Sequence, residues 1–75
     1  MTLADLNINE EAVIDCLDVD DESYHRRLNG MGFRCGSKII VIRKSPFNGP
    51  IHVRVGTTDF AIRRSDAESI IVKMD

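Results

Sequence analysis

Four side chains in this sequence could act as ligands of a transition metal. They are the thiols of Cys16 and Cys35 and the imidazoles of His25 and His52. Structural zinc sites are usually built from closely spaced pairs such as C-x2-C, because two ligands on one turn of chain lose less entropy when the site assembles. The spacings here are nine, ten and seventeen residues. We therefore expect no metal site, with Cys16 as a small core residue and both histidines on the surface.

The sequence gives equally weak evidence for a catalytic site. A nucleophilic cysteine needs a base within hydrogen-bond reach and a cleft that excludes water, and a domain of this size has little cleft. The adjacent carboxylates Asp20 and Asp21 suit a helix cap better than acid–base chemistry. The segment GMGFRCG contains Gly-x-Gly, but a phosphate loop follows a strand and precedes a helix, and the order predicted here is the reverse. We predict that the protein is not an enzyme.

Length and composition predict one globular domain over residues 1–75. The chain is 43% hydrophobic and 29% charged, which is typical of a folded protein, and a chain this short cannot support two cores. Its N-terminus has no apolar secretory segment, and its longest apolar run, Ile39 to Ile42, is far below the roughly 20 residues that span a bilayer. We expect a reduced, cytoplasmic location, with recruitment to the inner face of the membrane only through a partner.

The charges are sorted along the chain, although the net charge is only −2. Residues 1–22 carry eight acids and no base, whereas residues 26–64 carry nine bases against Asp59 alone. The basic segment could form a binding face, or the two segments could neutralise each other in the fold. The pI near 5.6 favours the second interpretation and is poor for nucleic-acid binding. Stacking platforms for bases are also scarce, since only Phe47 is expected to be an exposed aromatic residue.

A helix followed by an abrupt strand is the clearest local pattern. Tyr24, Leu28 and Met31 form a narrow apolar stripe at helical spacing, after Asp20 or Asp21 as the N-cap. Gly32 is placed to close this helix in a left-handed conformation, with Phe33 then contacting Leu28.

The remaining elements are short. One helical turn, TLADL, should place Leu3 and Leu6 in the core, and a capping box of Ser65 and Glu68 should open a second turn. The first strand alternates imperfectly, which predicts a bulge near its middle. The predicted strands cover residues 11–18, 37–44, 51–55, 57–64 and 69–73.

The order of these elements predicts a fold that is mainly β with one short α-helix: an SH3-like small five-stranded barrel. An OB-fold would place its helix between the third and fourth strands, where this chain has only a tight turn at Gly56. Between the second and third strands, SPFNGP predicts a hairpin loop with Phe47 exposed at its tip.

The run RRLNGMGFRCGSKIIVIRKSPFNGPIHVRV, followed by FAIRRSDAESIIV, resembles the FeoA family. The positions that match the family pattern in order and spacing are Leu28, Met31, Gly32, Gly36, Arg43, Pro46, Pro50, Ile51, Val53, Ala61, Arg63 and Ala67. Three positions depart from it. Cys35 stands where proline is common, Asn48 and Gly49 replace Gly-Asp, and Gly30 loosens a helix turn.

This resemblance implies a non-enzymatic cytoplasmic accessory protein of ferrous iron uptake. Its implied partner is FeoB, a membrane iron permease with an N-terminal GTPase domain. No cofactor, no nucleic-acid partner and no direct membrane insertion are expected, and ferrous iron would be held at most loosely. From exposure and charge we predict that the contact residues are Arg26, Arg27, Phe47, Asn48, Arg63 and Arg64. The alternatives are an SH3-like regulatory module of the kind found in iron-dependent repressors, a nucleic-acid-binding module, and a weak transition-metal carrier.

Overall fold

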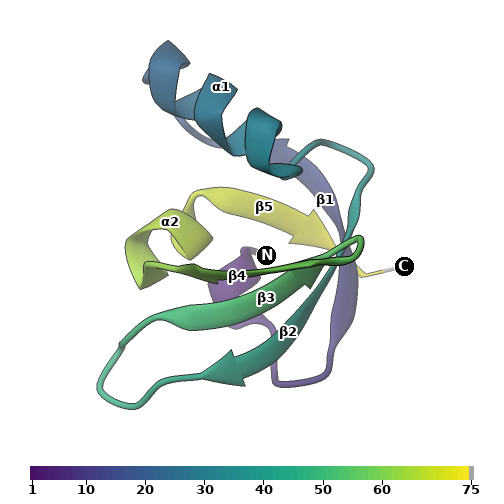
Figure 1. The fold of residues 1–75 in the computed structure, drawn as a ribbon, viewed down its shortest axis with the longest axis vertical. Helices are drawn as coiled ribbons and strands as arrows, with labels where there is room; N and C mark the ends of the chain where they lie inside the picture. Colours follow the sequence, from purple (N-terminus) through teal and green to yellow (C-terminus); the bar gives the residue numbers. More distant parts are fainter. Residues whose placement is uncertain (75) are drawn as a thin grey trace.

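A computed structural model describes residues 1–74 and shows five antiparallel strands in one strongly curved sheet (Figure 1). The strands are β1 (Glu11–Leu17), β2 (Lys38–Lys44), β3 (Ile51–Val55), β4 (Thr58–Ile62) and β5 (Ile70–Lys73). The helices are the single turn η1 (Leu3–Asp5), α1 (Glu22–Met31) and α2 (Arg64–Glu68). The sheet order is β4-β3-β2-β1-β5. The predicted mainly β class, with one helix between the first two strands, is confirmed. No helix within residues 1–74 has the length and apolar character needed to cross a membrane.

The core lies inside this curve and is formed by alternate residues of the strands. In β3, Ile51, Val53 and Val55 are buried while His52 and Arg54 are exposed, as the alternation predicts for a sheet with one wet face. The turn η1 completes the core from the N-terminal side. Leu3 and Leu6, the two side chains predicted to reach the core, are both fully buried.

Strand β1 contains the predicted irregularity. Its pairing with β5 shifts register between Ile14 and Cys16, so that Asp15 and Cys16 are both exposed while Ile14 and Leu17 stay buried. The expectation that Cys16 is a core residue is wrong. Asp15 is the extra residue, since Ile14 pairs with Val72 and Cys16 with Ile71, and the bulge leaves both Asp15 and Cys16 facing outward.

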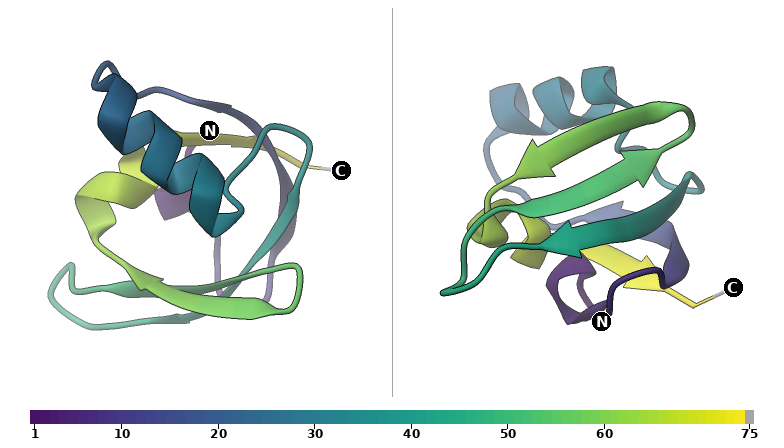
Figure 2. Two further views of the ribbon diagram at one scale, coloured as in Figure 1. Left: turned by 45° about the horizontal axis from the view of Figure 1, so that its top comes forward. Right: turned by 60° about the horizontal axis from the view of Figure 1, so that its bottom comes forward.

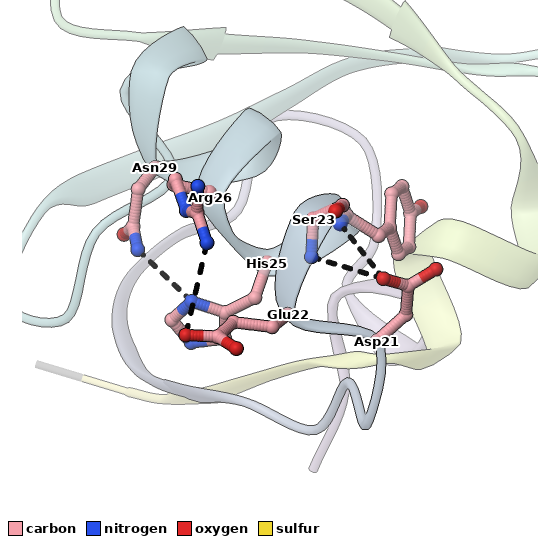
Figure 3. Close-up of polar contacts among 7 residues, drawn as sticks. Asp21, Glu22, Ser23, His25, Arg26 and Asn29 are labelled. Atoms are coloured by element: carbon pink, nitrogen blue, oxygen red, sulfur yellow. Dashed lines mark hydrogen bonds and ion pairs between the residues drawn. The ribbon is translucent and has the colours of Figure 1, made fainter.

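Helix α1 begins and ends as its sequence predicts. The Asp21 carboxylate accepts hydrogen bonds from the backbone N–H groups of Ser23 (2.9 Å) and Tyr24 (3.4 Å) at the N-terminus (Figure 3). At the C-terminus Gly32 has φ +106°. The Phe33 N–H then donates to the Leu28 carbonyl at 3.0 Å, which is the long bond of a Schellman motif.

Helix α2 starts two residues earlier than the predicted capping box implies. Arg63 is the N-cap, with extended backbone and no side-chain cap bond. Ser65 therefore lies inside the first turn, and the predicted capping box of Ser65 and Glu68 is wrong. The Glu68 carboxylate instead lies 3.9 Å from the Arg64 guanidinium, one turn away.

The two edges of the sheet differ. Beyond β5, Thr2 forms a bridge with Ile71, and the Val72 N–H donates to the Met1 carbonyl at 3.0 Å. The N-terminal residues therefore cover the β5 edge. Strand β4 forms the other edge, and β3 is its only neighbour in the sheet.

Candidate partner-binding surface

The six predicted contact residues occupy three places on the surface. They lie on α1, in the loop between β2 and β3, and at the start of α2: Arg26, Arg27, Phe47, Asn48, Arg63 and Arg64. Helix α1 and the β2–β3 loop lie at opposite ends of the molecule, with α2 between them (Figures 1 and 2). The six residues therefore do not form one continuous patch.

The α1 and α2 residues meet around Tyr24. The Tyr24 hydroxyl donates a hydrogen bond to the Asp66 carboxylate of α2. The Arg27 guanidinium lies over the Tyr24 ring, 5.2 Å from its centroid, which is within the range of a cation–π contact. Arg63 is also close enough to act electrostatically on this phenol. The junction thus joins one ring, one carboxylate and two guanidinium groups, and it ties α1 to α2.

The environment of Tyr24 favours its neutral form. Burial is the largest cause and raises the pKa of Tyr24 to about 12, and the hydrogen bond and negative charge of Asp66 add to the effect. Arg27 and Arg63 act in the opposite direction. Sequence reasoning placed Tyr24 only on the apolar stripe of the helix. The hydroxyl itself indicated that a partner was needed, since a tyrosine at a core-facing position usually requires a hydrogen-bond acceptor.

This junction predicts a loss of stability at alkaline pH. The pKa of Tyr24 is near 12 in the folded state against about 10 in an unfolded chain. Its contribution is therefore complete below pH ~10 and is lost as the pH rises towards 12. Tyr24 is the only tyrosine and there is no tryptophan, so the ultraviolet absorbance of tyrosinate reports this group alone. We expect a midpoint near 12 in native protein, and a midpoint near 10 would contradict the buried hydrogen bond.

The other face of α1 makes only local contacts (Figure 3). The Arg26 guanidinium lies 3.7 Å from the Glu22 carboxylate, and both side chains are largely exposed, at 74% and 89%. Surface pairs of this kind contribute about 0–1 kcal/mol. The ring of His25 meets the Asn29 amide at 3.0 Å. Arg26 is therefore held only by a weak surface pair and could exchange it for a carboxylate on a partner.

Phe47 is the most exposed large apolar side chain of residues 1–74, at 99%. It stands at the centre of the β2–β3 loop, where the Gly49 N–H donates to the Pro46 carbonyl at 3.1 Å. The two central residues of this turn, Phe47 and Asn48, have φ of +57° and +59°. The turn is thus centred one residue before the Asn-Gly pair that suggested it.

This geometry holds the phenylalanine ring away from the protein. An L-residue in the left-handed region costs roughly 1–2 kcal/mol, and Phe47 gains no burial in return. The end of the loop is closely packed, because a Cβ atom on Gly49 would lie 2.9 Å from the Ser45 Cβ. Strained residues of this kind concentrate at sites of ligand contact.

Direct ion pairs do not bring the acidic and basic segments together. Of the ion pairs within residues 1–74, only Glu22 with Arg26 joins an acid of residues 1–22 to a base of residues 26–64, and it lies within one helix. On the outer face of the sheet, Arg43 of β2 pairs with His52 of β3, which pairs with Ala61 of β4. Basic side chains thus remain available on this face.

The four possible metal ligands are spread over the fold. Cys16 and Cys35 are free and exposed, the first on β1 and the second in the turn after α1. His52 lies on the outer face of β3, and His25 contacts Asn29 on α1. Within the part of the chain that the structure describes, no three His, Cys, Asp or Glu side chains lie close enough together to hold a metal ion.

Comparison with known families and curated proteins agrees with the sequence pattern. Residues 1–74 match the model of the FeoA domain. The chain is also 31% identical over 75 residues to a Fe(2+) transport protein A/Fe(2+) transporter FeoB fusion protein of Porphyromonas gingivalis. That match covers 99% of this chain but 9% of the fusion protein.

Solved structures of similar sequence share the whole fold. FeoA of Stenotrophomonas maltophilia, solved with zinc and described as an SH3 domain protein, is 33% identical with a TM-score of 0.85, covering 97% of this chain and 89% of its own. Iron(II) transport protein A of Clostridium thermocellum is 32% identical with a TM-score of 0.90, covering 99% and 45%. FeoA of Chlorobium tepidum is 30% identical with a TM-score of 0.90, covering 99% and 70%.

Part of a manganese-dependent transcriptional repressor has the same fold, with a TM-score of 0.87 at 18% identity over 97% of this chain and 35% of the repressor. That likeness concerns the fold alone. The family match over residues 1–74, with FeoA structures of 30–33% identity, identifies the protein: the barrel is SH3-like, as predicted, and the chain belongs to the FeoA family.

Proposed function

We propose that this domain is a non-enzymatic accessory protein of ferrous iron uptake that docks on the cytoplasmic part of the FeoB permease. Family membership supports the link to iron uptake. The relative of Porphyromonas gingivalis, named as a fusion of transport protein A with FeoB, supports association between the two kinds of protein. The domain would reach the inner face of the membrane through this partner.

The observation that carries the docking proposal is the strained display of Phe47. A side chain that is 99% exposed and held in a left-handed conformation is better explained by binding than by stability. Aromatic side chains are enriched among the residues that dominate protein interfaces. The β2–β3 loop is therefore the proposed anchor, with its ring inserted into an apolar pocket of the permease.

The arginines of α1 and α2 would act as a separate, electrostatic contact. Arg26 keeps only a weak surface pair, Arg27 lies over the Tyr24 ring, and Arg63 acts electrostatically on the Tyr24 phenol. Charged groups at the rim of an interface mainly increase association rate and specificity. Because they lie far from the loop, a partner that contacts both sites must wrap around the α2 side of the domain.

The decisive experiment is a binding titration of isotopically labelled protein with the purified cytoplasmic part of FeoB, followed by amide resonances. We expect localised shifts around Phe47 and around Arg26 and Arg27. Replacing Phe47→Asn should weaken binding about tenfold or more, while folding stability is unchanged or higher because asparagine tolerates the left-handed conformation.

Two matched variants isolate the role of the ring. Phe47→Tyr keeps an aromatic ring and should keep most of the affinity. Ile8→Asn removes a different exposed apolar side chain, 51% exposed, and should have no effect. Equal affinity of Phe47→Asn and wild type would contradict the proposed anchor. RNA and ferrous iron serve as further ligands: shifts across the basic strands that vanish steeply with salt would indicate a nucleic-acid module, and shifts at Cys35 and His52 a metal carrier.

A further inference from the structure

The outer edge of β4 carries unused backbone hydrogen-bonding groups. The two-residue turn Gly56–Thr57 joins Val55 to Thr58, and in such a turn these two residues form a hydrogen-bonded pair. Because hydrogen-bonded and non-hydrogen-bonded pairs alternate along an antiparallel ladder, the register directs the N–H and C=O groups of Asp59 and Ala61 away from β3. Within residues 1–74, no backbone bond outside the strand ladders involves either residue.

Nothing in the described chain covers this edge as the N-terminus covers β5. In the right-hand view of Figure 2, β4 forms the rim of the sheet and α1 lies farther from the viewer, behind the rim. Asp59 and Ala61 are exposed, and so is Arg63, whose backbone is still extended after the strand. An open edge of this kind is a template for another strand.

The sequence along the edge is complementary to itself. If two copies of β4 pair antiparallel about a two-fold axis at Ala61, the backbone groups of Ala61 bond to those of the other Ala61. The Asp59 carboxylate already accepts hydrogen bonds from Arg54 of its own chain, at 2.7 and 3.2 Å, in a half-exposed pair. In the dimer it also faces Arg63 of the other copy, and this second opposite-charge contact occurs twice by symmetry. On the inner face, Phe60 lies beside Ile62 of the other copy. The outward groups of Asp59 and Ala61 and the N–H of Arg63 match this register, because these residues are two positions apart. The Arg63 carbonyl already accepts from the Ala67 N–H of α2 at 3.0 Å.

We propose that this domain forms a weak two-fold dimer through its β4 edges, with the Asp59–Arg63 pairs selecting the register. The occupant is a second copy, because the reciprocal charge pairs need a partner with the same sequence. The dimer extends the sheet across the contact and leaves the Phe47 loop free. It shares Arg63 with the proposed electrostatic contact but not the Phe47 anchor, so loss of dimerisation and loss of the anchor are separately measurable.

Sedimentation equilibrium of the whole protein tests this proposal. The average mass should rise from 8.4 kDa towards twice that value with increasing concentration. Arg63→Asp and Asp59→Arg each place like charges opposite one another in both pairs and should weaken dimerisation about tenfold or more. A mixture of the two variants should recover it, because every facing pair in the heterodimer is again Asp with Arg. Arg43→Asp makes the same charge change away from the edge and should have no effect.

Hydrogen exchange gives a second readout that needs no substitution. The Ala61 N–H points to solvent in the monomer, so its exchange should slow at least tenfold as concentration rises, while exposed loop amides stay unchanged. The proposal is wrong if the mass stays at 8.4 kDa up to millimolar protein. It is also wrong if Ala61 exchange does not depend on concentration, or if the mixed variants associate no better than either variant alone.

Discussion

Replacing Phe33→Ala is expected to cause the largest loss of stability of any single substitution considered. Phe33 is fully buried and its ring centroid lies 5.2 Å from that of Phe60. Removing a buried phenylalanine ring costs about 3–5 kcal/mol. Small proteins hold roughly 0.05–0.15 kcal/mol per residue, which is on the order of 4–11 kcal/mol for a chain of this length. The loss is therefore a large part of the free energy of unfolding, and at the lower end of this range all of it, so the urea midpoint should fall sharply.

The chain contains a matched control for this substitution. Phe47→Ala makes the same chemical change at a side chain that is 99% exposed, so it removes no packing. Its free energy of unfolding, measured by urea denaturation, should stay within about 0.5 kcal/mol of wild type. If both variants lost stability equally, Phe47 would have to pack on the protein in solution.

Two glycines of the same helix should respond to alanine in opposite directions. Gly32 has φ +106°, whereas Gly30 lies within α1, and a Cβ at Gly30 would meet nothing within 4 Å. Gly32→Ala forces an L-residue into left-handed backbone and should destabilise by about 1–2 kcal/mol. Gly30→Ala should stabilise by about 0.5–1 kcal/mol, because it reduces the freedom of the unfolded chain and improves helix propensity.

Thermal unfolding of both variants measures this difference. Steric crowding does not contribute to the loss of stability expected for Gly32→Ala, since the added Cβ would lie 3.6 Å from the Val55 side chain, an ordinary van der Waals contact. The expected loss is therefore due to backbone conformation alone. Equal melting temperatures for the two variants would mean that the helix does not end at Gly32.

The sequence predicted the strands and the end of α1 well because these features depend on local chemistry. Alternation in β3 and the glycine at the end of α1 act within a few residues. The predicted bulge in β1 is also present, but its consequence for Cys16 was wrong. The pattern EAVIDCLD shows that alternation fails without showing which residue is the extra one, and pairing with β5 decides that.

Contacts between segments far apart in the sequence were harder to predict. The hydrogen bond between Tyr24 and Asp66 joins residues 42 positions apart, and no local pattern predicts it. The capping box at Ser65 was wrong because the helix follows directly after β4, with its N-cap two residues earlier at Arg63. In contrast, the exposure of Phe47 was predicted, since a ring between two prolines in a short loop has no core to reach.

The two ends of the chain differ in how they could connect this domain to another protein segment. The carbonyl of Met1 takes part in the sheet through Val72, so a segment attached before it would start beside the β5 edge. The end of β5 points away from the molecule on the side opposite the β2–β3 loop (Figures 1 and 2). A linker attached there would leave that loop facing outward, so that a tethered domain could swing its ring towards a binding pocket without straining the connection.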